Sequence, residues 1–167
     1  MANPSEPTTE RAAAAIRALL AGISAGSTYW YTPERVAMCA YFDESWLEGL
    51  GGPVYLIRAG EERVREDTTS QVEIATDFHI LVAVKSETAT DNPFLLQDGG
   101  ETGRSTVLNR VIRDVIQRLL TDPTLGGIAI NVMHETARVD REFFLMGDWL
   151  CAEITTTVLT LPLKTSV

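Results

Sequence analysis

After Ser105, apolar residues recur every three or four positions, a spacing that predicts an amphipathic helix. Ser105 can cap its start, and Pro123 ends it because the residue before a proline is pushed out of the helical region. Gly126 and Gly127 then allow the chain to reverse into a strand, in which apolar residues alternate along Ile128–Met133. The predicted core face of the helix consists of Leu108, Val111, Ile112, Val115, Ile116 and Leu119.

The same spacing predicts an earlier helix that begins at Pro7 and ends before Ala25-Gly26-Ser27. Four consecutive alanines give this helix a high intrinsic propensity. A loop rich in aromatic residues, Thr28–Pro33, follows it. The predicted core face consists of Ala12, Ile16, Leu19, Leu20 and Ile23.

Alternation of apolar and polar residues over Gln71–Lys85 predicts a long strand. Shorter strands are predicted at Val36–Phe42 and Pro53–Arg58, and a hairpin joins Glu142–Met146 to Trp149–Leu161 through Gly147-Asp148. In the long strand, one face consists of Val72, Ile74, Phe78, Ile80, Val82 and Val84, and the other of Glu73, Asp77, His79 and Lys85.

The predicted order of elements is α-β-β-β-α-β-β, which is typical of an α+β fold. We expect a mixed, mostly antiparallel sheet with two main α-helices packed on one face. The length of 167 residues favours a single domain over residues 7–167, preceded by a flexible arm at residues 1–6. A long loop at residues 86–104 has no periodic pattern, and loops of this length are usually functional or disordered.

Composition limits the classes of function. The net charge of −9 argues against a protein that binds nucleic acid over its general surface, because such binding neutralises phosphates. The two cysteines are expected to be buried free thiols. The apolar run from Ala12 to Ile23 is interrupted by Arg17 and is too short to span a bilayer, so no membrane association is predicted.

No stretch of the sequence has the residues of a known catalytic, cofactor or metal motif. Asp98–Ser105 is rich in glycine before a helix, but Arg104 stands where a phosphate-binding loop requires lysine. His134-Glu135 begins like a zinc-binding HExxH motif, but Arg138 replaces the second histidine. Pairs of acidic residues could serve a small carboxylate-dependent enzyme, although such pairs also occur on the surface of any acidic protein.

Two segments are candidates for contacts between subunits. Arg110, Arg113 and Arg118 follow helical spacing on the polar face of the second helix. They form either a solvated face, paired with Asp114 at i, i+4, or a surface that meets acidic residues of a neighbour. In the long loop, three consecutive apolar residues are candidate anchors for a neighbouring subunit: Phe94, Leu95 and Leu96.

One block of sequence is similar to a known family. DVIQRLLTDPTLGGIAINV (Asp114–Val132) is followed by an acidic segment and by WLCAEITTTV (Trp149–Val158). A leading helix, PVYLIRAGEE (Pro53–Glu62) and QVEIATDFHILVAVKS (Gln71–Ser86) precede it. This order resembles the tail terminator proteins of tailed phages, in which a similar helix ends in a D-x-T-L-G-G turn. The final strand of that family also has a tryptophan ahead of alternating apolar positions. The similarity covers residues 12–161 at the level of order and pattern.

The resemblance implies a minor tail protein of the virion, located at the head–tail interface and assembled in the host cytoplasm. Such subunits form a homo-oligomeric ring, a hexamer, that caps the tail tube, ends polymerisation of the tube protein and joins the head–neck connector. It implies no reaction, no cofactor and no catalytic residue. Leu125, Gly126, Gly127 and Trp149 would be determinants of the fold. Two alternatives remain: another head–tail joining or neck completion protein, and a small carboxylate-dependent enzyme.

In a terminator ring, DNA passes through the bore without specific binding. Acidic residues lining that bore would repel the duplex. The candidates for this lumen are the densest acidic cluster, on a predicted turn: Glu61, Glu62, Glu66 and Asp67.

Overall fold

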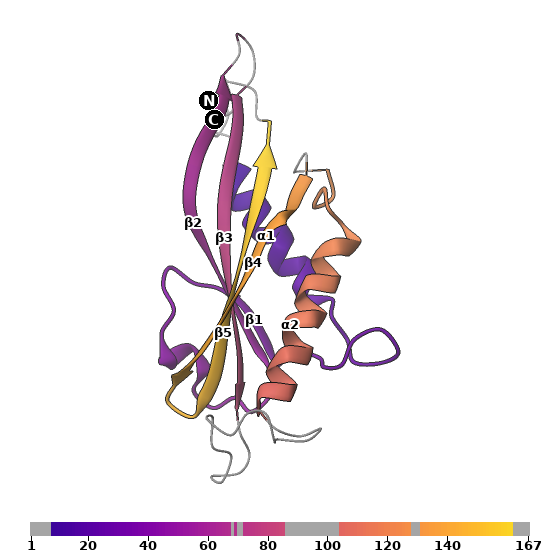
Figure 1. Ribbon diagram of the computed structural model, residues 1–167, viewed down its shortest axis with the longest axis vertical. Helices are drawn as coiled ribbons and strands as arrows, with labels where there is room; N and C mark the ends of the chain where they lie inside the picture. The colour runs from indigo at the N-terminus through magenta and orange to yellow at the C-terminus, as the bar shows by residue number, and fades with distance from the viewer. Residues whose placement is uncertain (1–7, 68, 70–71, 86–103, 128–130, 162–167) are drawn as a thin grey trace, which may run out of the picture.

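The computed structural model describes residues 8–67, 69, 72–85, 104–127 and 131–161, with the backbone alone at 66–67, 104–105 and 131–142. It contains two α-helices, five strands and one 3₁₀ helix (Figure 1). In chain order these are α1 (Thr8–Ala21), β1 (Arg35–Met38), η1 (Glu44–Leu47), β2 (Val54–Asp67), β3 (Val72–Lys85), α2 (Arg104–Thr121), β4 (Asn131–Met146) and β5 (Trp149–Thr160). The predicted order α-β-β-β-α-β-β is therefore confirmed, with η1 added.

The five strands form one sheet in the order β1-β2-β3-β5-β4. β1 is parallel to β2, and the other neighbours are antiparallel, so the sheet is mixed and mostly antiparallel as predicted. β5 lies between β3 and β4 and pairs with β3 along its full length, from Lys85↔Trp149 to Ile74↔Thr160.

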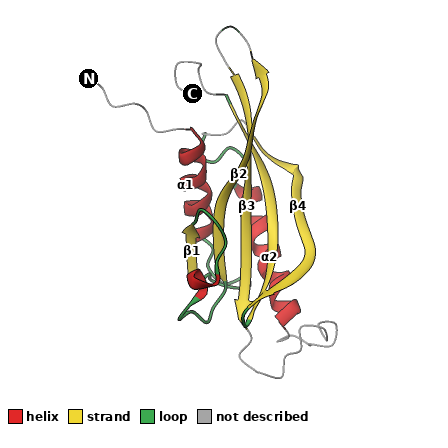
Figure 2. Cartoon of the chain, turned by 90° about the vertical axis from the view of Figure 1, so that its left-hand side faces the viewer, coloured by secondary structure: helices red, strands yellow, loops and turns green. Residues whose placement is uncertain are grey.

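Both helices pack on the same face of the sheet, and Figure 2 shows strands passing in front of α2. The predicted core positions Ile16 and Leu20 of α1 are fully buried, as are Leu108 and Val115 of α2. They pack in one cluster with the alternate apolar residues of β3 that the sequence predicts to face the core. Burial of this apolar surface is the main driving force for the fold. These β3 residues are Phe78, Ile80, Val82 and Val84.

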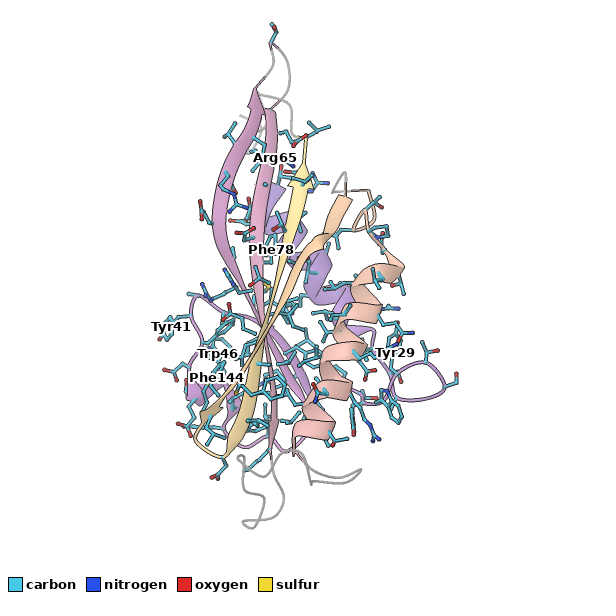
Figure 3. All side chains as sticks on the ribbon, in the orientation of Figure 1. Tyr29, Tyr41, Trp46, Arg65, Phe78 and Phe144 are labelled. Carbon is cyan, nitrogen blue, oxygen red and sulfur yellow. The ribbon has the colours of Figure 1, made fainter. Side chains whose placement is uncertain are left out.

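The opposite face of the sheet has a second, smaller core, which sequence periodicity did not predict. η1 and the segments around it cover one end of this face, and Leu47 is buried there against the sheet. Trp46 lies on this side, and Tyr29 lies on the side of the helices (Figure 3). The remaining buried members of this cluster are Val54, Leu56, Leu81, Ala83, Trp149 and Cys151.

Four predicted strands have different bounds in the structure. The strand expected at Val36–Phe42 is shorter, Arg35–Met38. The strand expected at Pro53–Arg58 continues to Asp67, because β3 supplies a hydrogen-bonding partner for its polar second half. The segments expected as separate strands on either side of residue 135 belong to one strand, β4, in which two register shifts accommodate the irregular pattern.

Four residues of the Asp-Pro-Thr-Leu-Gly-Gly sequence shape the turn that ends α2. Asp122 accepts a hydrogen bond from the backbone N–H of Gly126 over 2.8 Å. Leu125 is buried in the main core, although its φ of 49° is in the left-handed region. Gly126 and Gly127 follow with φ of 69° and 89°, values that glycine adopts without the steric cost of a Cβ atom. The turn is therefore fixed by backbone geometry and by one buried leucine.

In the described part of the chain, neither helix is long and apolar enough to cross a membrane.

The left-handed turn predicts different effects for two exposed glycines. A Cβ atom at Gly126 meets nothing within 4 Å, so Gly126→Ala introduces backbone strain alone and is expected to destabilise the fold by about 1 kcal/mol. Gly26 also has open space, but its φ is outside the left-handed region, so Gly26→Ala is not expected to destabilise the fold. Urea unfolding measures both. Equal effects of the two substitutions would contradict this account of the turn.

Candidate functional site

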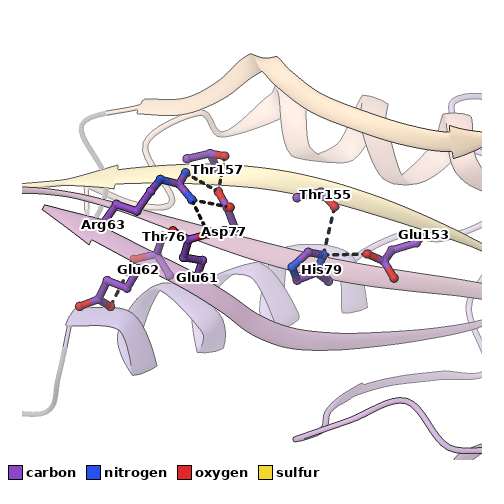
Figure 4. A network of polar contacts seen from close by, with 9 residues as sticks. All are labelled: Glu61, Glu62, Arg63, Thr76, Asp77, His79, Glu153, Thr155 and Thr157. Atoms are coloured by element: carbon purple, nitrogen blue, oxygen red, sulfur yellow. Dashed lines mark hydrogen bonds and ion pairs between the residues drawn. The ribbon is translucent and has the colours of Figure 1, made fainter. Parts of the chain in front are cut away.

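Charged pairs cross neighbouring strands on the face of the sheet opposite to the helices (Figure 4). Arg63 of β2 binds Asp77 of β3 through two hydrogen bonds, of 2.8 and 3.0 Å. The Thr157 hydroxyl of β5 donates a third hydrogen bond to Asp77, over 2.7 Å. Further along the same strands, Arg65 Nη1 lies 3.4 Å from Glu73 Oε1. The two acids are less exposed than the two arginines, so the arginines lie over carboxylates held close to the sheet.

A second part of this network joins β3 to β5. His79 Nδ1 lies 2.7 Å from Glu153 Oε1 and 3.1 Å from Thr155 Oγ1. The ring also lies against Gly60 of β2, where an added Cβ atom would be 2.5 Å from His79 Nε2. Gly60 and Glu61 form a β-bulge opposite Asp77, which makes room for the ring. The predicted polar face of β3 is thus confirmed, and His79 is bound within the chain.

The carboxyl groups with shifted pKa values do not suit acid catalysis. The Arg63 guanidinium lowers the pKa of Asp77 below its usual range. Hydrogen bonds from the backbone N–H groups of Gly52 and Gly51 lower the pKa of Glu34. Hydrogen bonds from Ser45 lower the pKa of Asp43. A carboxyl group that acts as a general acid at neutral pH needs a raised pKa. These three groups are instead ionised and bonded to their own chain.

The residues proposed to line a lumen do not form a single acidic patch. Glu61 and Glu62 lie on β2, so the prediction that they lie on a turn is wrong; pairing with β3 extends the strand through them. Glu61 Oε2 lies 3.5 Å from Arg63 Nη1. The Glu62 carboxylate instead accepts hydrogen bonds from the hydroxyl groups of Thr9 in α1 and Thr76 in β3. The backbone of Glu66 and Asp67 ends the same strand.

The expectation that Asp114 pairs with arginines on a solvated face is wrong. Asp114 is fully buried, and its carboxylate accepts hydrogen bonds of 2.9–3.0 Å from the backbone N–H groups of Trp30 and Tyr31. Residue 114 lies three positions after Val111, at the border of the core face, where the aromatic loop passes over α2. The position of Asp114 next to the core face is the sequence feature that indicates its burial. The sequence alone does not indicate which loop donates the hydrogen bonds to its carboxylate.

The three candidate arginines of α2 have different roles. Arg118 donates a hydrogen bond from Nε to the Leu19 carbonyl oxygen over 2.8 Å and so connects the two helices. The Arg110 guanidinium stacks on the Trp30 ring, 4.2 Å from its centroid. Arg113 is exposed. Of the three, Arg110 therefore lies beside the aromatic loop, Arg113 is exposed, and Arg118 belongs to the contact between the helices.

A groove of about 660 Å³ runs along the outer side of α2. Ile116 is half-buried in it, and Leu120 is 49% exposed, an unusual degree of exposure for a large apolar side chain. The groove is open to solvent and contains no cluster of ionisable groups among its described residues. Those lining residues are Asn109, Ile112, Arg113, Ile116, Gln117 and Leu120.

The predicted anchors Phe94, Leu95 and Leu96 lie outside the described residues. His134 and Glu135 lie on β4, where only the backbone is described. Among the side chains that the structure describes, no group of three His, Cys, Asp or Glu residues could hold a metal ion. Cys39 and Cys151 are both free thiols, and burial raises the pKa of the Cys151 thiol to about 12.

Comparison with known proteins finds no family model that matches the chain and no curated protein with significant similarity to it.

The buried Asp114 carboxylate predicts a large loss of stability on its removal. Asp114→Ala leaves two backbone N–H groups without their acceptor and is expected to lower the free energy of unfolding by about 2–4 kcal/mol. Asn109→Ala, at an exposed position of the same helix, is the matched control and should change it by less than about 0.5 kcal/mol. Urea unfolding followed by circular dichroism gives both values. Two similar values would contradict the role assigned to Asp114.

The Arg63–Asp77 pair predicts a pH dependence of stability. Because the pKa of Asp77 is lowered in the folded state, the pair stabilises the fold at neutral pH. This contribution is lost as the pH falls below the ordinary Asp value of 3.8 and through the lowered pKa. Asp77→Asn should lower stability at pH 7 by about 1 kcal/mol and flatten the acid limb of the pH–stability profile. Glu73→Gln, at the longer and more exposed pair, is the control and should leave both nearly unchanged.

Proposed function

We propose that the chain is a tail terminator subunit of a tailed phage, a structural protein that forms a hexameric ring on the end of the tail tube. The ring ends polymerisation of the tube protein and provides the joining surface for the head–neck connector. Its location is the head–tail interface of the virion, with assembly in the host cytoplasm. No catalytic residue, cofactor or metal takes part.

The observation on which this proposal rests is the Asp122–Gly127 turn between α2 and β4. The resemblance to the family centres on this block, and four of its six residues have a specific role in the fold: a hydrogen-bond acceptor, a buried leucine with positive φ, and two left-handed glycines. Three successive residues with positive φ restrict which side chains this turn accepts, and glycine meets that restriction at two of the three positions. The order of elements around it agrees with the family pattern from α1 to β5.

The edges of the sheet support a role in an assembly. β4 is a 16-residue strand at one edge. At the other edge, β1 pairs only with Val54–Ile57, so in the described chain the second half of β2 pairs with β3 on one side and has no strand on its outer side. Long edges with free backbone groups favour aggregation unless a partner covers them. A subunit that functions within a ring, between a tube and a connector, has such partners.

The alternative enzyme gains no support from the charged groups. The polar side chains that converge on the open face of the sheet bond to each other across β2, β3 and β5. An enzyme of this class needs two carboxyl groups whose environments separate their pKa values. The second alternative, another neck protein, has the same location in the virion and differs from a terminator in its binding partner.

The proposal predicts binding to the end of a tail tube without any head component. Purified protein added to polymerising tail tube protein should stop elongation, and electron microscopy should show a six-membered ring on one tube end. The control omits the protein, in which case the tubes continue to grow. Binding to the isolated connector but never to tube ends would favour the neck protein instead. A protein that binds neither and stays monomeric would contradict the proposal.

A further inference from the structure

Charge is distributed unevenly between the helices and the rest of the chain. α1 and α2 together contain six arginines and two acids, Glu10 and Asp114, of which Asp114 is buried. Since the whole chain has 14 basic and 23 acidic residues, eight basic and 21 acidic residues remain outside the helices. The two helices are therefore basic elements of an acidic chain, and an acidic surface would complement them.

The exposed side of the helix layer has the residue types that dominate binding energy at protein interfaces. Trp30 is 55% exposed, yet its backbone is fixed by Asp114 and its ring is stacked by Arg110. Tryptophan and arginine that are held in place in this way lose little entropy on binding and are enriched in hot spots. We define the α2 surface as Trp30, Arg110, Arg113, Ile116 and Leu120.

On the other side of the sheet, η1 and the β4–β5 turn form a second exposed surface. Tyr41 is 66% exposed and Phe144 is 39% exposed, and Figure 3 shows both on the same side of the molecule as Trp46. Glu44 and Glu48 are exposed in the same segment. The Glu44 carboxylate lies against Gly147, so the two segments are in contact. We define the η1 surface as Tyr41, Glu44, Trp46, Glu48 and Phe144.

Basic side chains near the η1 surface already have partners within the chain. Arg35 donates a hydrogen bond to the Trp46 carbonyl oxygen over 2.9 Å. Arg58 lies 5.0 Å from the centroid of the Phe42 ring, and Lys85 lies 5.9 Å from that of Trp149. These three cations keep their charge but are held beside the surface by those contacts, whereas the exposed charged residues of η1 and of its C-terminal neighbour are Glu44 and Glu48, accompanied by aromatic rings. This is the complement of the α2 surface, with its arginines, its tryptophan and its apolar groove.

We propose that the α2 surface of one copy of this chain binds the η1 surface of a second copy. The two surfaces lie on opposite sides of the same sheet (Figures 1 and 3). Each copy can therefore bind one neighbour through each side. Such a head-to-tail contact is heterologous and closes into a ring when the rotation between copies allows it. The choice of a second copy as the occupant rests on the proposed ring, but the contact itself can be tested without any other phage protein.

Charge reversal tests the contact through an alternating mixture. Arg113→Glu makes both surfaces of a copy acidic, and Glu48→Arg opposes the α2 surface with a basic residue. Each variant alone should associate about tenfold more weakly than the wild type, or less still. In an equimolar mixture, every Arg113→Glu copy can sit between two Glu48→Arg copies, so association should return to nearly the wild-type level. Sedimentation velocity over a concentration series, in solution and with tail tubes, measures these differences.

Two further substitutions control for net charge. Arg17→Glu and Glu10→Arg make the same charge changes at exposed positions of α1, outside the α2 surface, and should assemble like the wild type. Variants that assemble normally alone, or that are not rescued by mixing, would overturn this contact and leave tube capping intact. A wild-type protein that remains monomeric both in solution and on tube ends would overturn the contact and the proposed function together.

Discussion

The carboxylate of Asp114 is buried in the core and binds two backbone N–H groups more than 80 residues earlier in the chain. This contact fixes the aromatic loop between α1 and β1 to the side of α2. α1 can then pack on β1 and β2 while α2 packs on β3 and β5, so that one helix layer covers the sheet. The buried charge of Asp114 is stabilised because its carboxylate accepts charge-assisted hydrogen bonds from two backbone N–H groups. The position of the exposed Trp30 ring depends on the same contact.

The two faces of the sheet differ in how their side chains are accommodated: one face buries apolar side chains, and the other pairs charged ones. Towards the helices, alternate residues of β2, β3 and β5 are apolar and fully buried. On the other face, charged side chains lie in pairs across adjacent strands, and only the end beneath η1 is apolar. The paired groups have little unsatisfied bonding capacity, which makes this network a feature of the sheet surface rather than a reactive centre. Surfaces with exposed aromatic rings lie beside it and on the helix layer.

The spacing of apolar residues in the sequence predicts those helices and strands that bury a single face. The core faces of both helices and of β3 followed from spacing alone, since a single side of each element meets the core. The second half of β2 was missed because its strand conformation depends on pairing with β3 and not on its own polar sequence. The sequence predicts a surface position for Asp114, because a charged residue at the border of a helix's core face usually lies there. Identification of its donors required knowledge that the aromatic loop crosses α2, which is a long-range contact without a local signature.

The insertion of β5 between β3 and β4 also affects how the chain acquires its structure during synthesis. β5 is made after every other strand of this sheet, yet it is an interior strand. Until residues 149–160 leave the ribosome, the nascent sheet ends at β3, and β4 has no neighbour to pair with. The last step of folding must bring β4 and β5 together onto the exposed edge of β3. A partly synthesised chain therefore exposes the unpaired backbone groups of β3, an edge that favours aggregation until β5 pairs with it.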